Sequence, residues 1–473
     1  MPKLFGLPKI PIPGPKTLPL IGTPMKLFQF LEDPVGIVFN LRQYGDVAAV
    51  IADNPALVAV FGPENNKEIL SNPHLFQHDE QIFTGPQGSQ LNNLRHAIIA
   101  INGDNHRKHR RLMVPAFSRA ALEGYSSEIT DLTTYLISQW PVGTTVRMDS
   151  LLRELALCIA VQCFYGLDAR DGATELGKLA AGMVETLTDP LTILTPYNIP
   201  GTPYHRAVNL AESLMNKLSV LVDEKRANGP GGKDALSLLI QSSDEDGAAL
   251  SNDELIAEAT TLFIAGHETM AMTLSWTLFL LERHPLELER VLDEIETVLE
   301  DRIPTLTDLP HMPHTERVIK ESMRILAPVP LLFLRTCSSE LNVAGIKMPV
   351  GANIVVSPLA AHHDKNVFPE PERFIPDRWI NLTPPPYTYM PYGGGPRTCI
   401  GSIFANNALR LILPLVLRKY RYTIQENSDV SRLTRANILL AKKGIWMNIR
   451  PFDREMHKPP PITGDIGELV AFN

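Results

Sequence analysis

One stretch of sequence, between Ser251 and Pro285, constrains most strongly what this chain can fold into. Ser251-Asn-Asp-Glu254 has the spacing of a capping box, in which two side chains satisfy free amide groups at the start of a helix. Pro285 ends the helical pattern just after Arg283. A helix of roughly 30 residues is about 45 Å long, and this one is apolar on most sides. It must therefore run through the interior of a large core.

Helical patterns dominate the rest of the chain, and short strand patterns lie near its two ends. The 473 residues, 44% of them hydrophobic, are enough to bury such a core. We predict helices at 286–300, 315–326 and 400–418, and short strands at 47–51, 57–61, 331–336 and 354–357. The predicted fold class is mainly α with small β-sheets (α+β). We expect a Pro-rich extended segment at 1–25, a single domain at 26–455 and a C-terminal tail at 456–473.

Charge and cysteine content exclude several classes of protein. The formal net charge is −8, from 52 acidic and 44 basic residues, so nucleic acid is not an expected partner. The four cysteines do not form a disulfide framework, which fits a reducing compartment and predicts a cytoplasmic protein. Prolines interrupt residues 1–21, and the apolar stretch at 260–281 contains charged and polar side chains. We therefore predict no membrane anchor.

The most informative segment is a glycine-rich loop at 391–401, Pro-Tyr-Gly-Gly-Gly-Pro-Arg-Thr-Cys-Ile-Gly. Its glycines permit positive φ and let the backbone approach a flat ligand: they are Gly393, Gly394, Gly395 and Gly401. Arg397 offers a fork of donors to a carboxylate. A helix is predicted directly after Cys399, so that its first amides stabilise a thiolate. Such a thiolate suits a metal ligand, or the nucleophile of a cysteine hydrolase that has a distant histidine partner.

A second unusual segment, Ala265-Gly-His-Glu-Thr269, lies inside the long helix. Ala265 and Thr269 share a face, and the small residues Ala265 and Gly266 let the helix backbone approach a planar cofactor. The Thr269 hydroxyl can compete for the carbonyl of Ala265 and bend the helix, which leaves room for a small molecule. Glu268 is costly in an apolar helix unless it is paired or moves protons. A kink with a satisfied glutamate and a proton path both remain open.

Together these segments resemble the cytochrome P-450 superfamily. Its cysteine loop reads Phe-x-x-Gly-x-Arg-x-Cys-x-Gly, and this chain matches it at Gly395, Arg397, Cys399 and Gly401. Tyr392 replaces the phenylalanine, so we expect its ring to shield the sulfur and its hydroxyl to add a hydrogen bond that tunes the iron. The long helix matches the superfamily's Ala/Gly-Gly-x-Asp/Glu-Thr pattern.

The resemblance implies a fold, a cofactor and roles for named residues. The fold is a triangular prism of helices around a buried haem b, with Cys399 as the axial iron ligand. Pro391 and Tyr392 belong to the loop that carries this ligand. The resemblance further implies that Glu268 and Thr269 relay protons to dioxygen, while the thiolate favours cleavage of its O–O bond.

Further matches supply a structural triad and donors for the haem propionates. Glu321 and Arg324 resemble the superfamily's Glu-x-x-Arg pair, which joins the arginine of a Phe-x-Pro-x-Arg segment. We assign that arginine to Arg378 rather than to Arg373, because its spacing to the cysteine fits better. The expected propionate donors are His106, Arg110, Arg335 and Arg397.

The function implied is a monooxygenase that inserts one oxygen atom from O2 into a lipophilic molecule of the terpenoid, steroid or fatty acid class. The alternatives are a peroxide-dependent peroxygenase or isomerase, and a non-catalytic haem-thiolate sensor; the intact Glu268–Thr269 pair counts against both. Family position places these residues around the substrate: Phe83, Leu262, Ala265, Val329, Leu332, Phe333 and Leu439.

Electrons are expected from a separate protein, because no flavin- or nicotinamide-binding segment follows Cys399. We predict that NAD(P)H supplies them through a reductase and an acidic ferredoxin or flavodoxin. The docking site is a basic cluster that comprises Arg107, Lys108, His109 and Arg111, with Arg418, Lys419 and Arg421 as further members. The protein is expected to be a monomer.

Overall fold

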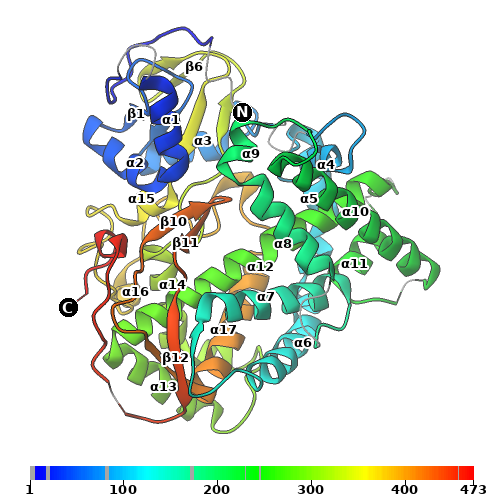
Figure 1. The fold of residues 1–473 in the computed structure, drawn as a ribbon, viewed down its shortest axis with the longest axis vertical. Coiled ribbons are helices and arrows are strands. Elements are labelled where there is room, and N and C mark those ends of the chain that lie inside the picture. The colour runs from blue at the N-terminus through cyan, green and yellow to red at the C-terminus, as the bar shows by residue number, and fades with distance from the viewer. Residues whose placement is uncertain are drawn as a thin grey trace.

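The computed structural model describes residues 6–17, 22–79, 85–170, 175–229, 231–243, 247–455 and 457–472. Its α-helices are α1 (Gly22–Glu32), α2 (Pro34–Leu41), α3 (Pro63–Ser71), α4 (Gln90–Asn93), α5 (Gly103–Met113), α6 (Arg119–Ile137), α7 (Met148–Tyr165), α8 (Glu175–Leu187), α9 (Pro190–Leu194), α10 (Pro203–Ala227), α11 (Ala235–Gln241), α12 (Asn252–Arg283), α13 (Pro285–Leu299), α14 (Pro313–Ile325), α15 (Pro358–His362), α16 (Arg378–Asn381) and α17 (Ser402–Lys419). In Figure 1, α12 crosses the middle of the molecule with α7 and α17 beside it, while α1, α2 and α3 lie together at one end.

Within the described residues the strands form four small sheets. They are β1 (Val47–Ala49), β2 (Val58–Val60), β3 (Phe76–Gln77), β4 (Thr145–Arg147), β5 (Arg335–Cys337), β6 (Leu341–Val343), β7 (Ile346–Met348), β8 (Asn353–Val356), β9 (Tyr420–Ile424), β10 (Arg432–Arg435), β11 (Ile438–Ala441) and β12 (Trp446–Pro451). The largest sheet has the order β1-β2-β8-β5-β3, in which only β2 and β8 are parallel. The others are β4-β12-β9, β10-β11 and β6-β7. The α+β class predicted from the sequence is confirmed.

The long helix has the bounds that its sequence signals predict. The Ser251 side chain accepts from the Glu254 amide, and the Glu254 side chain accepts from the Ser251 amide, so the capping box is formed. The 32 residues span about 48 Å, and α12 packs against α7, α8, α10, α14 and α17. Among the described residues, no helix is long and apolar enough to cross a membrane.

Several boundaries differ from the sequence predictions. Helix α1 begins at Gly22, inside the segment predicted to be extended to residue 25. Strand β5 is Arg335–Cys337, so it begins four residues later than the predicted 331–336 and ends one residue later. Helix α17 begins at Ser402, so two residues separate it from the cysteine.

The segment after residue 456 packs onto the rest of the protein. The side chains of Ile466, Leu469 and Val470 are buried in the main hydrophobic cluster. The Ala471 amide donates to the carbonyl of Glu372 at 2.7 Å. Residues 457–472 are therefore part of the same packed body as the helices.

A buried carboxyl near the end of α12 predicts a pH-dependent stability. Burial raises the pKa of Glu282 to about 7, although the Ile424 amide and Arg283 act in the opposite direction. Below pH 4.5 the Glu282 carboxyl is protonated in both the folded and the unfolded chain. Between pH 4.5 and about 7 it ionises in the unfolded chain but stays protonated in the folded one. The free energy of unfolding therefore falls as the pH rises through this range. Glu282→Gln should therefore raise the unfolding free energy by up to about 3 kcal/mol at pH 8 and change it little near pH 4.5. Urea unfolding at both pH values checks this, and equal stabilities at pH 8 would contradict it.

Candidate active site

The cysteine loop presents a thiol whose surroundings oppose its ionisation. The Cys399 side chain has an exposed surface, and its backbone amide donates to the carbonyl of Tyr392 at 2.9 Å. Burial on the remaining sides raises the pKa of Cys399, while a hydrogen bond from the Gly401 amide and the charge of Arg110 lower it by less. The Gly401 amide supplies the stabilisation of a thiolate that the sequence predicts, but burial outweighs it in the protein alone. Iron binding has to displace the thiol proton.

The glycines serve contacts within the protein. Gly395 has φ +70°, and a Cβ there would lie 2.1 Å from the carbonyl oxygen of Leu70 in α3. A Cβ on Gly266 would lie 2.4 Å from the Phe164 ring of α7. The absence of a side chain at this position therefore allows α7 to pack closely against α12. Positive φ, which glycine permits at all four loop positions, occurs at two of them, Gly393 and Gly395.

The aromatic residue of the loop lacks the hydrogen bond expected of it. The Tyr392 hydroxyl is buried and has no partner among the described residues. Burial, with a smaller contribution from Cys399, raises its pKa. A neutral hydroxyl enclosed in this way leaves Tyr392 as an apolar shield beside the sulfur.

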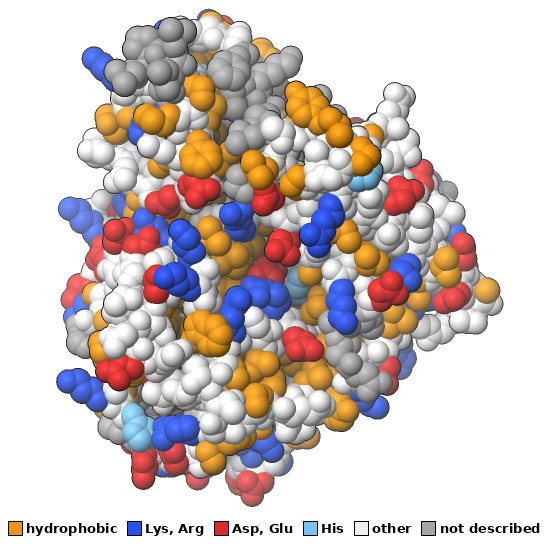
Figure 2. Space-filling view, in the orientation of Figure 1, with side chains coloured by type: hydrophobic (Ala, Val, Ile, Leu, Met, Phe, Trp, Pro, Cys, Tyr) orange, Lys and Arg blue, Asp and Glu red, His pale blue; other side chains and the backbone are white. Residues whose placement is uncertain are grey.

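On α12 the Thr269 hydroxyl donates to the carbonyl of Ala265 at 2.9 Å, the bond that their spacing predicts. Ala265 is exposed in the middle of a helix that is otherwise mostly buried, so its face borders an open space. In Figure 2 the molecule is hollowed near the centre of the face shown, and apolar, acidic and basic side chains line the hollow.

Glu268 is paired with a cation on the adjacent helix α7. Both of its carboxylate oxygens accept from Arg153, through Nε at 3.0 and 2.8 Å and Nη2 at 2.9 Å. The two side chains are 21% and 28% exposed, so water reaches the pair. The structure thus shows a satisfied glutamate that also has access to solvent protons.

A group of cations beside the loop has unsatisfied donors. Arg335 and His106 are buried, and Arg335 Nη1 and Arg397 Nε have no partner among the described residues. Burial and the neighbouring Arg397 lower the pKa of Arg335 to about 9, burial lowers that of Arg397 to about 10, and burial followed by Arg397 lowers that of His106 to about 4. Buried cations without counterions are unfavourable. Two carboxylates would pair with the two guanidinium groups and could accept a hydrogen bond from the neutral His106, so the donor set fits the propionates of a haem.

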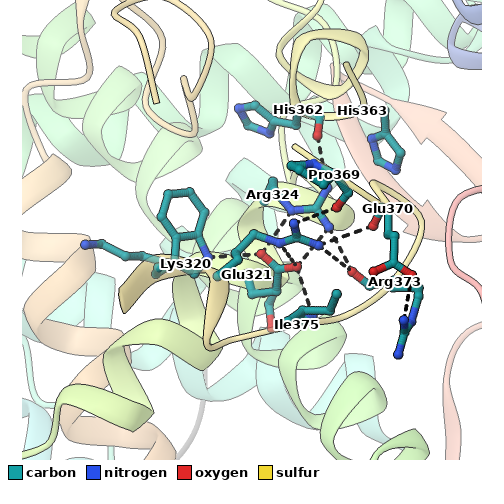
Figure 3. A network of polar contacts seen from close by, with 12 residues as sticks. Lys320, Glu321, Arg324, His362, His363, Pro369, Glu370, Arg373 and Ile375 are labelled. Atoms are coloured by element: carbon teal, nitrogen blue, oxygen red, sulfur yellow. Dashed lines mark hydrogen bonds and ion pairs between the residues drawn. The ribbon is translucent and has the colours of Figure 1, made fainter. Parts of the chain in front are cut away.

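The buried triad forms around Glu321 (Figure 3). Arg324 donates to both carboxylate oxygens at 2.9 Å, and Arg378 Nε donates to Oε1 at 2.9 Å. The structure therefore brings Arg378 and not Arg373 into the triad, since the Arg373 side chain pairs with Glu370. Glu321 and Arg324 are both completely buried.

Other residues extend this network to the cysteine loop. Glu321 also accepts from the Ile375 amide and from Trp379 Nε1, each at 3.0 Å. Arg324 donates to the carbonyl of His362, whose Nε2 accepts from the Met390 amide at 2.8 Å. Met390 directly precedes the loop. His362 was missed in the sequence because no local pattern marks a buried histidine that links a helix, here α14 through Arg324, to the segment before the cysteine loop.

Comparisons with known proteins decide the family. A family model described as Cytochrome P450 matches residues 12–449. This chain belongs to the cytochrome P450 family. Pentalenene oxygenase of Streptomyces avermitilis is 28% identical to this P450 over 433 residues, which cover 90% of the chain and 94% of the relative. Cyclooctat-9-en-7-ol 5-monooxygenase of Streptomyces melanosporofaciens is 29% identical over 417 residues, 86% of the chain and 88% of the relative.

Two solved structures share the P450 fold. Retinoic acid-bound cyanobacterial CYP120A1 has a TM-score of 0.79 at 22% identity and covers 94% of this chain and 100% of its own. The cytochrome P450DA haem domain has a TM-score of 0.82 at 23% identity and covers 96% and 100%. The protein is thus a P450 monooxygenase with haem as its cofactor and O2 as co-substrate.

The residues expected to line the P450 substrate pocket differ in how far their side chains are buried. Val329, Leu332 and Phe333 are half-buried, and Leu262 is 7% exposed. Leu439 is completely buried in the main core. The expectation that it touches substrate is corrected, because strand alternation turns Leu440 to the opposite side, where it is half-buried. Phe83 lies outside the described residues.

The basic cluster expected to dock an electron donor is smaller than predicted. Arg107 and Arg111 are exposed, and Arg107 forms an ion pair with Asp104. His109 faces inward to Glu254 and Glu258, and Arg421 is 4% exposed. These two residues are therefore removed from the predicted surface.

Proposed function

We propose that this P450 inserts one oxygen atom from O2 into a terpenoid. The observation that carries this proposal is the apolar character of the side chains assigned to the pocket, among them Leu262, Ala265 and Phe333. The two bacterial relatives, whose names denote oxygenation of cyclic terpenoids, support the same substrate class. Apolar contacts hold such a substrate without a charged anchor.

The residues around the loop hold the cofactor in this proposal. Haem supplies the activation of dioxygen when it is bound. Cys399 binds its iron through sulfur, and Arg335, Arg397 and His106 donate to its propionates. Arg110, which donates to the carbonyl of Thr398 at 2.7 Å, supports the loop and adds positive charge. Tyr392, Pro391, Gly395 and Gly401 shape the loop around the sulfur.

Glu268 and Thr269 deliver protons in this proposal. Glu268 takes protons from solvent at its pair with Arg153, and its carboxylate turns toward the Thr269 hydroxyl to pass them on. Thr269 Oγ1 holds the proton next to the space that borders Ala265. The expected side reaction, when a proton is misplaced, is release of hydrogen peroxide.

Thr269→Ala tests the proton path. With O2, an NAD(P)H-dependent donor chain and a bound terpenoid, the productive rate should fall on the order of 10²-fold, and the electrons should appear as hydrogen peroxide. Thr269→Ser is the matched control, because it keeps the hydroxyl. Full coupling of electron use to product formation in the alanine variant contradicts the proton role.

The substrate class is tested separately. Terpenoids, steroids and fatty acids are screened for a change in haem spin state, and a response to fatty acids alone contradicts the proposed class.

The electron donor proposed is a separate ferredoxin or flavodoxin, reduced by its own NAD(P)H-dependent reductase. Its acidic surface would meet the exposed Arg107 and Arg111 on α5. This helix also carries Arg110, which contacts the residue before Cys399, so a donor seated there lies close to the sulfur side of the haem.

A further inference from the structure

A fully buried carboxyl group lies in the first half of α12, well before Glu268 and Thr269 in the same helix. Glu258 is 0% exposed. Its Oε1 accepts hydrogen bonds from the Ile98 amide and from His109 Nδ1, each at 2.7 Å, and its Oε2 has no partner among the described residues. Burial of a charged group costs several kcal/mol, so the contacts of this side chain indicate what it does.

The first contact leads to Arg397. While the Ile98 amide donates to Glu258, the Ile98 carbonyl accepts from Arg397 Nη1 at 3.3 Å. The Ile101 carbonyl accepts from Arg397 Nη2 at 2.6 Å, and Asn102 Oδ1 accepts from it at 2.8 Å. Residues 98–102 thus supply the acceptors that surround the Arg397 guanidinium. Glu258 connects the first of these residues to α12 through the Ile98 amide.

The second contact leads to Arg110. His109 Nδ1 lies 2.7 Å from Glu258 Oε1 and its Nε2 lies 3.2 Å from Glu254 Oε1, so each ring nitrogen has a carboxyl oxygen as its partner. Burial lowers the pKa of His109, but the hydrogen bonds and charges of Glu258 and Glu254 outweigh it and the net shift is upward. Arg110, the next residue, donates to the Thr398 carbonyl.

We propose that Glu258 is a positioning residue for the haem site. It ties α12 to the two segments that support the cysteine loop, one through Ile98 to Arg397 and the other through His109 to Arg110. In this proposal Glu258 makes no contact with the haem itself. It acts by fixing the positions of Arg397 and Arg110. This inference rests on the propionate role proposed for Arg397.

Glu258→Gln tests the proposal in the haem-loaded protein. Glutamine keeps the shape and the acceptor for the Ile98 amide, but it removes the carboxyl group that pairs with His109 Nδ1. Transfer of haem to excess apomyoglobin should become about 10-fold faster, as for other residues that support a metal ligand indirectly. His109→Gln, which breaks the same link from the α5 side, should act in the same direction and serves if the first variant does not fold.

The pH dependence of haem transfer separates positioning from a general loss of stability. The titratable groups that face His109 are Glu254 and Glu258 on α12 and His106 on its own helix. Burial raises the pKa of Glu258, and His106 is neutral above about pH 4. In the parent protein, transfer should accelerate as the pH rises through the raised pKa of His109, because the imidazolium is lost. Glu258→Gln should transfer haem rapidly at every pH, with a flat profile. An unchanged slope would overturn the proposal.

Two controls complete the test. Glu282→Gln makes the same substitution in the same helix at a carboxyl not linked to the loop, and it should leave the transfer rate unchanged. Arg397→Gln tests the propionate role alone: if it has no effect, that assignment is wrong. If Arg397→Gln speeds transfer and Glu258→Gln does not, only the positioning role of Glu258 is wrong. In the double variant the effect of Glu258→Gln should shrink, and a full additive effect would show that Glu258 acts elsewhere.

Discussion

Replacement of Cys399 by serine is expected to abolish the red-shifted carbon monoxide band of the reduced protein and its monooxygenase activity. A serine hydroxyl donates far less electron density to iron than a thiolate, so the electronic property that defines the spectrum is lost. The side chain has an exposed surface and serine has nearly the same shape as cysteine, so unfolding of the haem-free variant should stay within about 0.5 kcal/mol of the parent. Difference spectroscopy and urea unfolding measure the two effects.

The matched control is Cys158→Ser. Cys158 is buried in α7, where burial raises its pKa to about 12, and it has no path to the haem. This variant should keep the carbon monoxide band and lose some stability. Persistence of the band in Cys399→Ser, or its loss in Cys158→Ser, would contradict the assignment of the iron ligand.

Glu321→Gln should destabilise the protein far more than removal of a carboxylate from an exposed ion pair. Its carboxylate accepts from Arg324, Arg378, Trp379 and the Ile375 amide. Removing the charge leaves the guanidinium of Arg324 completely buried without a counterion, which costs about 3–5 kcal/mol. Urea unfolding of the haem-free protein measures this directly.

Glu370→Gln is the control for that experiment, because it also removes a carboxylate that pairs with an arginine. Its partner is Arg373, and both side chains are about half exposed. An exposed pair contributes about 0–1 kcal/mol. A similar loss of unfolding free energy in the two variants would mean that the buried triad contributes no more to stability than an exposed ion pair. If Glu321→Gln is not recovered, Arg378→Gln breaks one arm of the same network.

Local sequence patterns predicted the parts of this structure that depend on neighbouring residues. The capping box and Pro285 set the bounds of α12 because both act within one helical turn of its ends. The Thr269 bond to Ala265 likewise follows from a spacing of four residues. The choice of Arg378 over Arg373 depended on spacing to the cysteine, and the structure has the same pairing.

Properties that arise from distant partners could not be predicted in this way. Glu258 and His109 are 149 residues apart in sequence, and Arg153 and Glu268 are 115 apart. The sequence reveals the helix amides near Cys399 but not the burial of the thiol, which outweighs them in setting its pKa. The contact of Gly266 could not be predicted either, since only the position of α7 shows that the Phe164 ring packs against it.

The parallel pairing of β2 with β8 has a consequence for biosynthesis. Val58 pairs with Ile354 and Val60 with Val356, so nearly 300 residues emerge from the ribosome after β2 before its neighbour does. Until then β1 and β2 form a two-stranded hairpin, which is at best marginally stable in water. At about 5–20 residues per second, that interval lasts roughly 15–60 s. Chaperone demand during translation should therefore centre on the first 60 residues, whose sheet is finished only when the chain is three-quarters made.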